Sequence, residues 1–113
     1  MIRPLIALAV LIAATPAIAQ RVSPAVQQRL AELGAQLGQC HRGAAVRMAR
    51  TRLNADQVAD RALAACAPRE APIRQTLARA VGAGRAQSTL MAQRRHWRQT
   101  IVTIVQQARF TRR

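Results

Sequence analysis

The fold is decided by residues 23–66, which read SPAVQQRLAELGAQLGQCHRGAAVRMARTRLNADQVADRALAAC. The pattern predicts a long helix, a tight turn at Leu53 and Asn54, and a shorter helix that returns beside the first. Cys40 and Cys66, the only two cysteines of the chain, each lie thirteen residues from Leu53. Because an α-helix rises ~1.5 Å per residue, both reach the same height in an antiparallel pair. The spacing therefore predicts a Cys40–Cys66 disulfide that staples a helical hairpin.

The first helix of this hairpin has clear start and packing signals. Ser23 is a good N-cap, and Pro24 suits the first helical position because the N–H that it lacks needs no partner there. One face then carries apolar residues at steps of three and four, the spacing of a helix packed against a neighbour: Val26, Leu30, Leu33, Leu37, Cys40 and Ala44. Gly34 and Gly38 lie one step off this face, where they either let another helix approach closely or are tolerated in solvent.

The second helix carries a capping box. Asn54 and Gln57 lie three residues apart, so each side chain can accept a hydrogen bond from the backbone N–H of the other. Pro68 ends this helix because proline does not continue a helix past its first turn. The hairpin is therefore expected to span residues 24–66.

A shorter third helix is predicted over residues 72–82 and a last one over residues 87–110. Glu70 and Arg74 are spaced for an i,i+4 ion pair near the start of the third helix. Gly82 is suited to its C-cap. The chain is therefore predicted to be all-α: a disulfide-stapled antiparallel hairpin with one or two further helices in a small bundle.

The last helix has an apolar stripe and one ambiguity. Its stripe consists of Leu90, Trp97, Ile101, Ile104, Val105 and Ala108. Residues 100–105 are six β-branched residues in a row, which is also typical of a strand. The surrounding steps of three and four favour the helix.

The first nineteen residues have the pattern of a signal peptide. Arg3 precedes an apolar run at positions 5–14, and a small-x-small site at Ala17 and Ala19 predicts cleavage after Ala19. Ten apolar residues are too few to span a bilayer, which needs ~20. We therefore expect one mature helical domain over residues 20–113, exported to the periplasm or secreted, where a disulfide persists.

The chain is strongly basic, with 18 arginines, no lysine and four acids. Two explanations compete for the choice of arginine over lysine: the planar guanidinium suits phosphate and carboxylate binding, and codon usage in a GC-rich genome favours arginine. We favour codon usage. The net charge still predicts attraction to phosphate-rich polymers and anionic membranes. The basic residues gather near the end of the first helix and along the last helix: Arg42, Arg47, Arg50, Arg52, Arg94, Arg95, Arg98, Arg109, Arg112 and Arg113.

Four of these, Arg94, Arg95, Arg98 and Arg109, are the candidate anion-binding residues. A solvated basic face without a ligand is the alternative. Specific nucleic-acid recognition is not expected, because the chain has one Trp, one Phe and no Tyr to stack on bases.

No constellation of residues points to catalysis, a cofactor or a metal. Covalent haem needs Cys-x-x-Cys-His, and position 37, where the first cysteine would stand before Cys40 and His41, is leucine. Structural zinc needs four ligands at recognisable spacing. His41 and His96 are therefore expected to be partly exposed helix residues, and the protein is expected not to be an enzyme.

The segment from about Leu37 to Cys66 resembles small exported two-cysteine bacterial proteins of unassigned function. Cys40, Ala44-Ala45, Ala55-x-x-Val58-Ala59 and Ala62-x-x-Ala65-Cys66 carry the resemblance. It implies an exported, disulfide-stapled helical hairpin, and it brings no activity and no functional residues.

The function predicted first is an exported interaction protein that binds a protein partner, or a second copy of itself, through its last helix. The face for this is Trp97, Ile101, Ile104, Val105 and Phe110, if the alanine-lined hairpin cannot cover them all. The alternative arrangement is that this helix closes the bundle. A second function is a cationic module that contacts anionic envelope surfaces through lipid or lipopolysaccharide phosphates. An enzyme or cofactor carrier is the third and weakest hypothesis.

Overall fold

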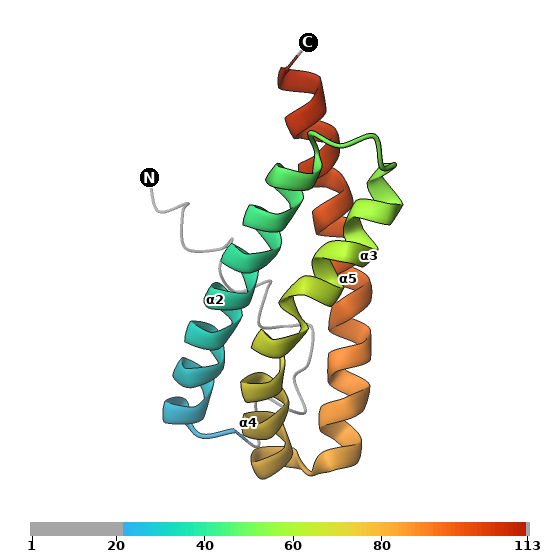
Figure 1. Ribbon diagram of the computed structural model, residues 1–113. Coiled ribbons are helices and arrows are strands. Elements are labelled where there is room, and N and C mark those ends of the chain that lie inside the picture. The colour runs from blue at the N-terminus through green and yellow to red at the C-terminus, as the bar shows by residue number, and fades with distance from the viewer. Residues whose placement is uncertain (1–21, 113) are drawn as a thin grey trace, which may run out of the picture.

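A computed structural model of the protein describes residues 22–112 (Figure 1). The predicted signal peptide and its cleavage site lie outside these residues. The described helices are α2 (Pro24–Met48), α3 (Ala55–Cys66), α4 (Ala71–Val81) and α5 (Ala83–Thr111), and a short 3-10 segment (Ala67–Arg69) joins α3 to α4. The all-α class and the small helical bundle are confirmed.

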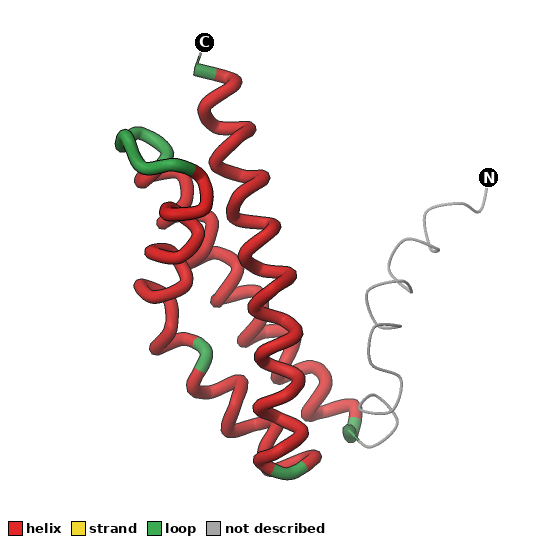
Figure 2. The backbone as a smooth tube through the Cα atoms, turned by 90° about the vertical axis from the view of Figure 1, so that its right-hand side faces the viewer, coloured by secondary structure: helices red, strands yellow, loops and turns green. Residues whose placement is uncertain are grey.

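The helices form a bundle in which α2, the α3–α4 pair and α5 all contact one another. Helix α2 rises along one side, α3 and α4 follow each other back down, and α5 returns along the whole length (Figure 1). Turned by 90°, the helices still lie side by side, with loops at the two ends and a short break between α3 and α4 (Figure 2). Helix α5 packs against α2, α3 and α4, so it holds the hairpin and its extension together.

The predicted starts of α2 and α3 are confirmed. The Ser23 side chain accepts a hydrogen bond from the Val26 N–H at 3.3 Å. At the start of α3, the Gln57 N–H donates to Asn54 Oδ1 at 2.8 Å, and the Asn54 N–H donates to Gln57 Oε1 at 3.0 Å. These bonds satisfy backbone groups that have no partner within the helix.

The junction between α4 and α5 is tighter than the sequence predicted. Gly82 ends α4 with a φ of 92°, a left-handed conformation that glycine adopts without a steric penalty. Because this one residue reverses the chain, α5 begins at Ala83 instead of near Gln87. Residues 100–105 lie within α5, so they form a helix and not a strand.

The core is built from large apolar residues of every helix and from fully buried alanines. Leu37, Leu90 and Ile101 are among its largest fully buried side chains. Ala45, Ala59, Ala62 and Ala86 have no exposed surface. Alanines at the contact surface let the helix axes approach closely, so a chain with few large apolar residues still fills its interior.

The two glycines beside the apolar face of α2 are not contact points. A Cβ atom added at Gly34 or Gly38 would meet nothing within 4 Å, and both residues are exposed. No described helix approaches α2 there, and of the two predicted explanations tolerance in solvent is the correct one.

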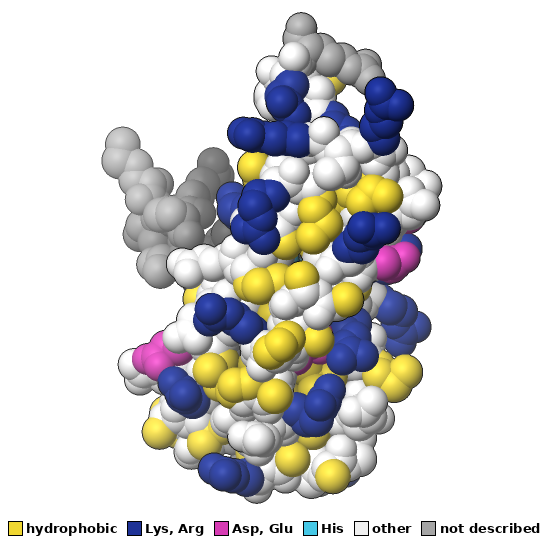
Figure 3. All heavy atoms as spheres, viewed as in Figure 1, with side chains coloured by type: hydrophobic (Ala, Val, Ile, Leu, Met, Phe, Trp, Pro, Cys, Tyr) yellow, Lys and Arg dark blue, Asp and Glu magenta, His cyan; other side chains and the backbone are white. Residues whose placement is uncertain are grey.

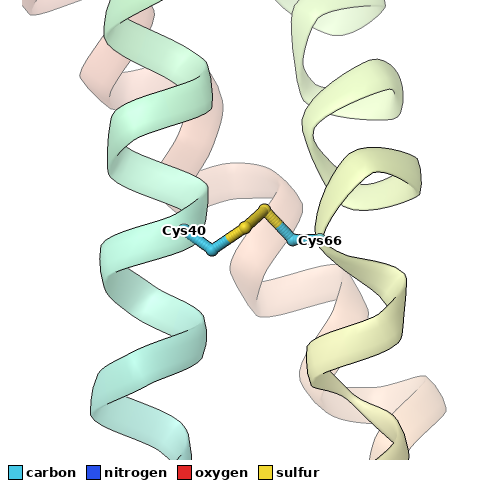
Figure 4. The surroundings of a disulfide bond; sticks show 2 residues. All are labelled: Cys40 and Cys66. Atoms are coloured by element: carbon cyan, nitrogen blue, oxygen red, sulfur yellow. A yellow bond between two sulfur atoms is a disulfide. The ribbon is translucent and has the colours of Figure 1, made fainter.

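The predicted disulfide is confirmed. Cys40, in the middle of α2, is bonded to Cys66, the last residue of α3, with a Cα–Cα distance of 5.9 Å (Figure 4). The bond therefore ties α2 to the point where α3 passes into the 3-10 segment. A disulfide forms and persists in an oxidising compartment, so its presence indicates such an environment.

Candidate functional site

The predicted partner-binding face of α5 is mostly turned into the bundle. Ile101 and Val105 have no exposed surface, and Trp97 and Ile104 are partly buried against the same core. Phe110 is 76% exposed. Helix α5 thus closes the bundle with four of these five side chains, and Phe110 is the one of the five that it leaves to solvent.

Arg98, predicted to bind anions, is engaged by carboxylates of α3. Its Nε donates to Asp60 at 3.1 Å and its Nη1 to Asp56 at 3.0 Å. The hydrogen bonds to Asp60 and Asp56, with the charges of the two carboxylates, raise the pKa of Arg98 above its usual value. The two carboxylates lie in the first half of α3, so this contact attaches α5 to the start of that helix.

Arg109, another predicted anion-binding residue, binds backbone oxygens instead. Its Nε donates to the carbonyl of Ala49 at 3.0 Å, and its Nη2 donates to the carbonyls of Thr51, at 3.2 Å, and Leu53. The last carbonyls of a helix have no partner within it, and a cation near them is stabilising. Arg109 therefore holds the end of α2 and the loop after it in place.

Arg94, the third, is paired with a buried acid. Its Nε lies 2.8 Å from Oε1 of Glu70, whose side chain is only 2% exposed. The i,i+4 pair of Glu70 with Arg74 that the sequence suggested does not form, because Glu70 points into the bundle towards α5. Of the four predicted anion-binding arginines, Arg95 alone is exposed with no such partner within residues 22–112.

All four acidic side chains of the protein form ion pairs with arginines. Glu32 lies 3.8 Å from Arg29, and Glu70 is paired with Arg94. Asp56 and Asp60 are both bound by Arg98. Fifteen arginines are described, and three have an acidic partner, so 15 − 3 = 12 have none among the described residues. These twelve are Arg42, Arg47, Arg50, Arg52, Arg61, Arg69, Arg74, Arg79, Arg85, Arg95, Arg109 and Arg112.

Three of these twelve arginines, Arg50, Arg52 and Arg112, lie at one end of the bundle together with Phe110. We call the surface formed by these four residues the arginine tip. The hydrogen bonds of Arg109 bring the loop after α2 against the last turns of α5. All four residues of the tip are exposed. Basic side chains surround this end of the molecule in the space-filling view (Figure 3). The tip thus combines three cations with one exposed aromatic ring.

The interior of the bundle contains a histidine that the sequence predicted to be partly exposed. His41 is 5% exposed, which corrects the prediction of a partly exposed residue, and its ring centroid lies 5.6 Å from that of Trp97. Its Nε2 is buried and has no hydrogen-bond partner in the structure. Burial lowers the pKa of His41, and the negative charge of Glu70 offsets part of this effect.

The signal for His41 was present in the sequence. His41 follows Leu37 by four residues and precedes Ala44 by three. Its position in the sequence therefore fits the apolar face of α2 as well as the position of Cys40 does. No comparable signal marked Glu70, because its partner Arg94 is 24 residues away in the chain.

Two further features would bear on function: a metal-binding cluster and a membrane-spanning helix. Within residues 22–112, no group of three or more His, Cys, Asp or Glu residues is close enough to hold a metal ion. Among the helices of the same residues, none has the length and apolar character that crossing a membrane requires.

Comparison of the chain with protein-family models, curated proteins and solved structures finds no match. The functional argument therefore rests on the arginines and on the groups around them.

Proposed function

We propose that the protein is an exported, non-enzymatic module that binds the phosphate groups of an anionic lipid surface through its arginine tip. The observation that supports this proposal is the use of the acids: all four are paired with Arg29, Arg94 or Arg98, and none with an arginine of the tip. Among the described residues, Arg50, Arg52 and Arg112 thus have no carboxylate within 4 Å. The predicted signal peptide and the disulfide support the export of the protein to the periplasm or beyond.

The chemistry of the tip suits such a surface. A guanidinium donates paired hydrogen bonds to phosphate oxygens, and each Arg near an anionic membrane contributes about 1 kcal/mol of attraction. Phe110 is 76% exposed, and an apolar side chain among cations can enter the boundary between headgroups and acyl chains. Arg109 orders the loop that carries Arg50 and Arg52, which lowers the entropy lost on binding.

The test is co-sedimentation with vesicles, either phosphatidylcholine alone or mixed with phosphatidylglycerol, at 50 and 300 mM salt. The wild type should bind only the mixed vesicles, and less at high salt. Removing about 1 kcal/mol for each charge predicts that the double variant Arg50→Gln/Arg52→Gln binds roughly 30-fold more weakly.

The matched control is Arg79→Gln/Arg85→Gln, which removes two exposed arginines at the opposite end, on either side of Gly82. It should retain most of the binding. An equal loss in both double variants would mean that net charge alone acts and would reject the tip as the binding site.

A protein partner or self-association through α5 is the second candidate. Phe110 favours it, because it is a large exposed apolar side chain on that helix. Association through Phe110 should persist at 300 mM salt, where phosphate contacts weaken. Sedimentation equilibrium of the wild type and of Phe110→Ser decides: a strictly monomeric wild type would reject self-association.

A further inference from the structure

A second arginine-lined feature lies on the side of the bundle, beside the disulfide. It is a groove of about 290 Å³ between α2 and the 3-10 segment. We call it the disulfide groove, and its lining residues are Gln36, Gln39, Cys40, Gly43, Arg47 and Arg69. Its volume is at the lower end of the range for ligand pockets, which suits one small ligand or one chemical group.

Helix α2 supplies one wall of the disulfide groove. Gln36, Gln39, Gly43 and Arg47 follow each other at steps of three, four and four residues, so they share one face of the helix. Helical side chains lean towards the N-terminus of their helix. Nη1 of Arg47 accordingly lies 3.5 Å from the position that a Cβ atom on Gly43 would take. The Arg47 guanidinium therefore lies beside Gly43, at the distance of an ordinary van der Waals contact with a Cβ atom there.

Arg69 supplies the second cation from the other side. Its sequence neighbour Glu70 cannot neutralise it, because that carboxylate is buried and bound to Arg94 of α5. Arg47 has no acidic partner within 4 Å in the described part of the chain either. Two guanidinium groups therefore line one concavity with no internal anion, an arrangement that a bound anion stabilises.

The disulfide makes this arrangement rigid. Cys40 lines the groove itself, and its partner Cys66 is three residues before Arg69 (Figure 4). The covalent bond thus fixes the distance between the helix that carries Arg47 and the segment that carries Arg69. A site whose donors are already held in place loses less entropy when it binds a ligand.

From this geometry we infer that the disulfide groove binds a single phosphate group. Arg47 and Arg69 supply the charge, and the amides of Gln36 and Gln39 supply further donors. An inorganic phosphate or a phosphate monoester has more acceptor oxygens than a carboxylate and carries a charge of about −1.5 to −2 at pH 7, which suits two guanidinium groups. The phosphate is either inorganic or esterified in a headgroup or a sugar. The inference does not rest on the proposed function of the arginine tip, which is a separate surface.

The test is a titration of the intact oxidised protein with inorganic phosphate at constant ionic strength. Backbone amide chemical shifts locate the binding site, and calorimetry measures the affinity. The shift changes should centre on Gly43, Arg47 and Arg69. Because a charged hydrogen bond contributes about 1.5–3 kcal/mol, Arg69→Gln should weaken phosphate binding by at least roughly 10-fold. Shift changes spread evenly over all exposed arginines would overturn the site.

Two further variants distinguish phosphate binding in the groove from an effect of net charge and from a loss of the fold. The charge-matched control is Arg74→Gln, an exposed arginine on α4 outside the groove lining, which should change phosphate binding by less than about twofold. Gly43→Gln keeps the charge and fills the groove, so it should weaken binding as Arg69→Gln does while the helix content stays unchanged. A Gly43→Gln protein that binds phosphate normally would reject the inference.

The source of the phosphate and the independence of the tip are read from two further titrations. Glycerol 3-phosphate that binds more tightly than inorganic phosphate would indicate an esterified ligand, and equal binding would indicate free phosphate. The tip variant Arg50→Gln/Arg52→Gln should bind inorganic phosphate like the wild type. If it loses that binding while Arg69→Gln retains it, the inferred phosphate site is not in the groove.

Discussion

The bundle is joined in two physically different ways. Helices α2 and α3 are tied by the covalent Cys40–Cys66 bond. Helix α5 is attached to them by its apolar stripe and by three arginines, Arg94, Arg98 and Arg109, which bind acids and carbonyls of the other elements. The first junction does not depend on salt or on protonation. In the polar part of the second, salt screens the exposed pairs of Arg98, whereas the Glu70 carboxylate bound by Arg94 is buried.

This difference shows how one residue type takes two roles in a very basic chain. The arginines of α5 that face the bundle find partners, and they use up three of the four acids. Arg50 and Arg52 at the tip and Arg47 and Arg69 in the disulfide groove have no acidic partner among residues 22–112. The pairing within the bundle therefore determines which arginines remain for a ligand.

Breaking the covalent junction should have the largest effect. For a loop of about 27 residues, chain-entropy arithmetic gives the disulfide roughly 3–3.5 kcal/mol. Cys40→Ser should therefore lower Tm by well over ten degrees, since ~1 kcal/mol shifts a domain of this size by several degrees. Calorimetry of the oxidised wild type and the variant measures the change. A shift of only a few degrees would mean that α5 alone holds the hairpin closed.

Removing the buried ion pair at the second junction should have the next largest effect. Arg94→Met leaves the Glu70 carboxylate, 2% exposed, without its partner. An unsatisfied buried acceptor costs about 1–3 kcal/mol, and more when it is charged, so we expect a loss of about 3 kcal/mol at pH 7. Denaturant unfolding measures it. The double variant Arg94→Met/Glu70→Gln should recover part of the loss, and no recovery would show that Arg94 acts through its packing.

A smaller effect should appear on acidification, through His41. Burial places its pKa in the folded protein below the ordinary 6.5, so the unfolded chain binds this proton more readily. The stabilisation that the buried neutral His41 contributes is fully present above about pH 6.5. It is lost as the pH falls from about 6.5 to the pKa of His41 in the folded protein. Denaturant midpoints between pH 8 and 5 measure the slope. His41→Leu should flatten the dependence of stability on pH, and the variant of the exposed residue, His96→Gln, serves as the control. Equal slopes in the wild type and both variants would show that His41 does not cause the dependence.

The sequence predicted the covalent half of this comparison and missed the polar half. Cys40, Cys66, Ser23 and the Asn54 cap were found because their signals are local or follow from counting residues along two helices. The partners of Arg94, Arg98 and Arg109 are 24 to 60 residues away in the chain. Pairing at that distance depends on how α5 lies against α3, which periodicity does not specify.

The candidate site shows the same limit. The sequence correctly indicated an excess of arginine, but it gave the anion-binding role to three residues that the fold uses internally. Arg69 was not singled out, because only the disulfide and the 3-10 segment bring it opposite Arg47. For Trp97 and Ile104 the sequence left open an exposed strip or a helix that closes the bundle. The structure shows the second, because the small side chains of α3 leave enough room to bury most of their surface.

The smallest effect should come from the exposed ion pairs of α5. Arg98 bridges Asp56 and Asp60, whose side chains are 70% and 64% exposed, and solvent screens charges at such positions. We expect Arg98→Gln to lower Tm only slightly in low salt and not at all in 1 M salt, where the Debye length is about 3 Å.

The matched comparison is Arg94→Met, whose acid is buried and therefore little screened. Its loss of stability should remain in 1 M salt. If both variants lost their effect in high salt, the Glu70 pair would behave as a surface pair. The polar attachment of α5 would then be salt-dependent along its whole length, and the folded protein would rely on its disulfide and apolar core in concentrated salt.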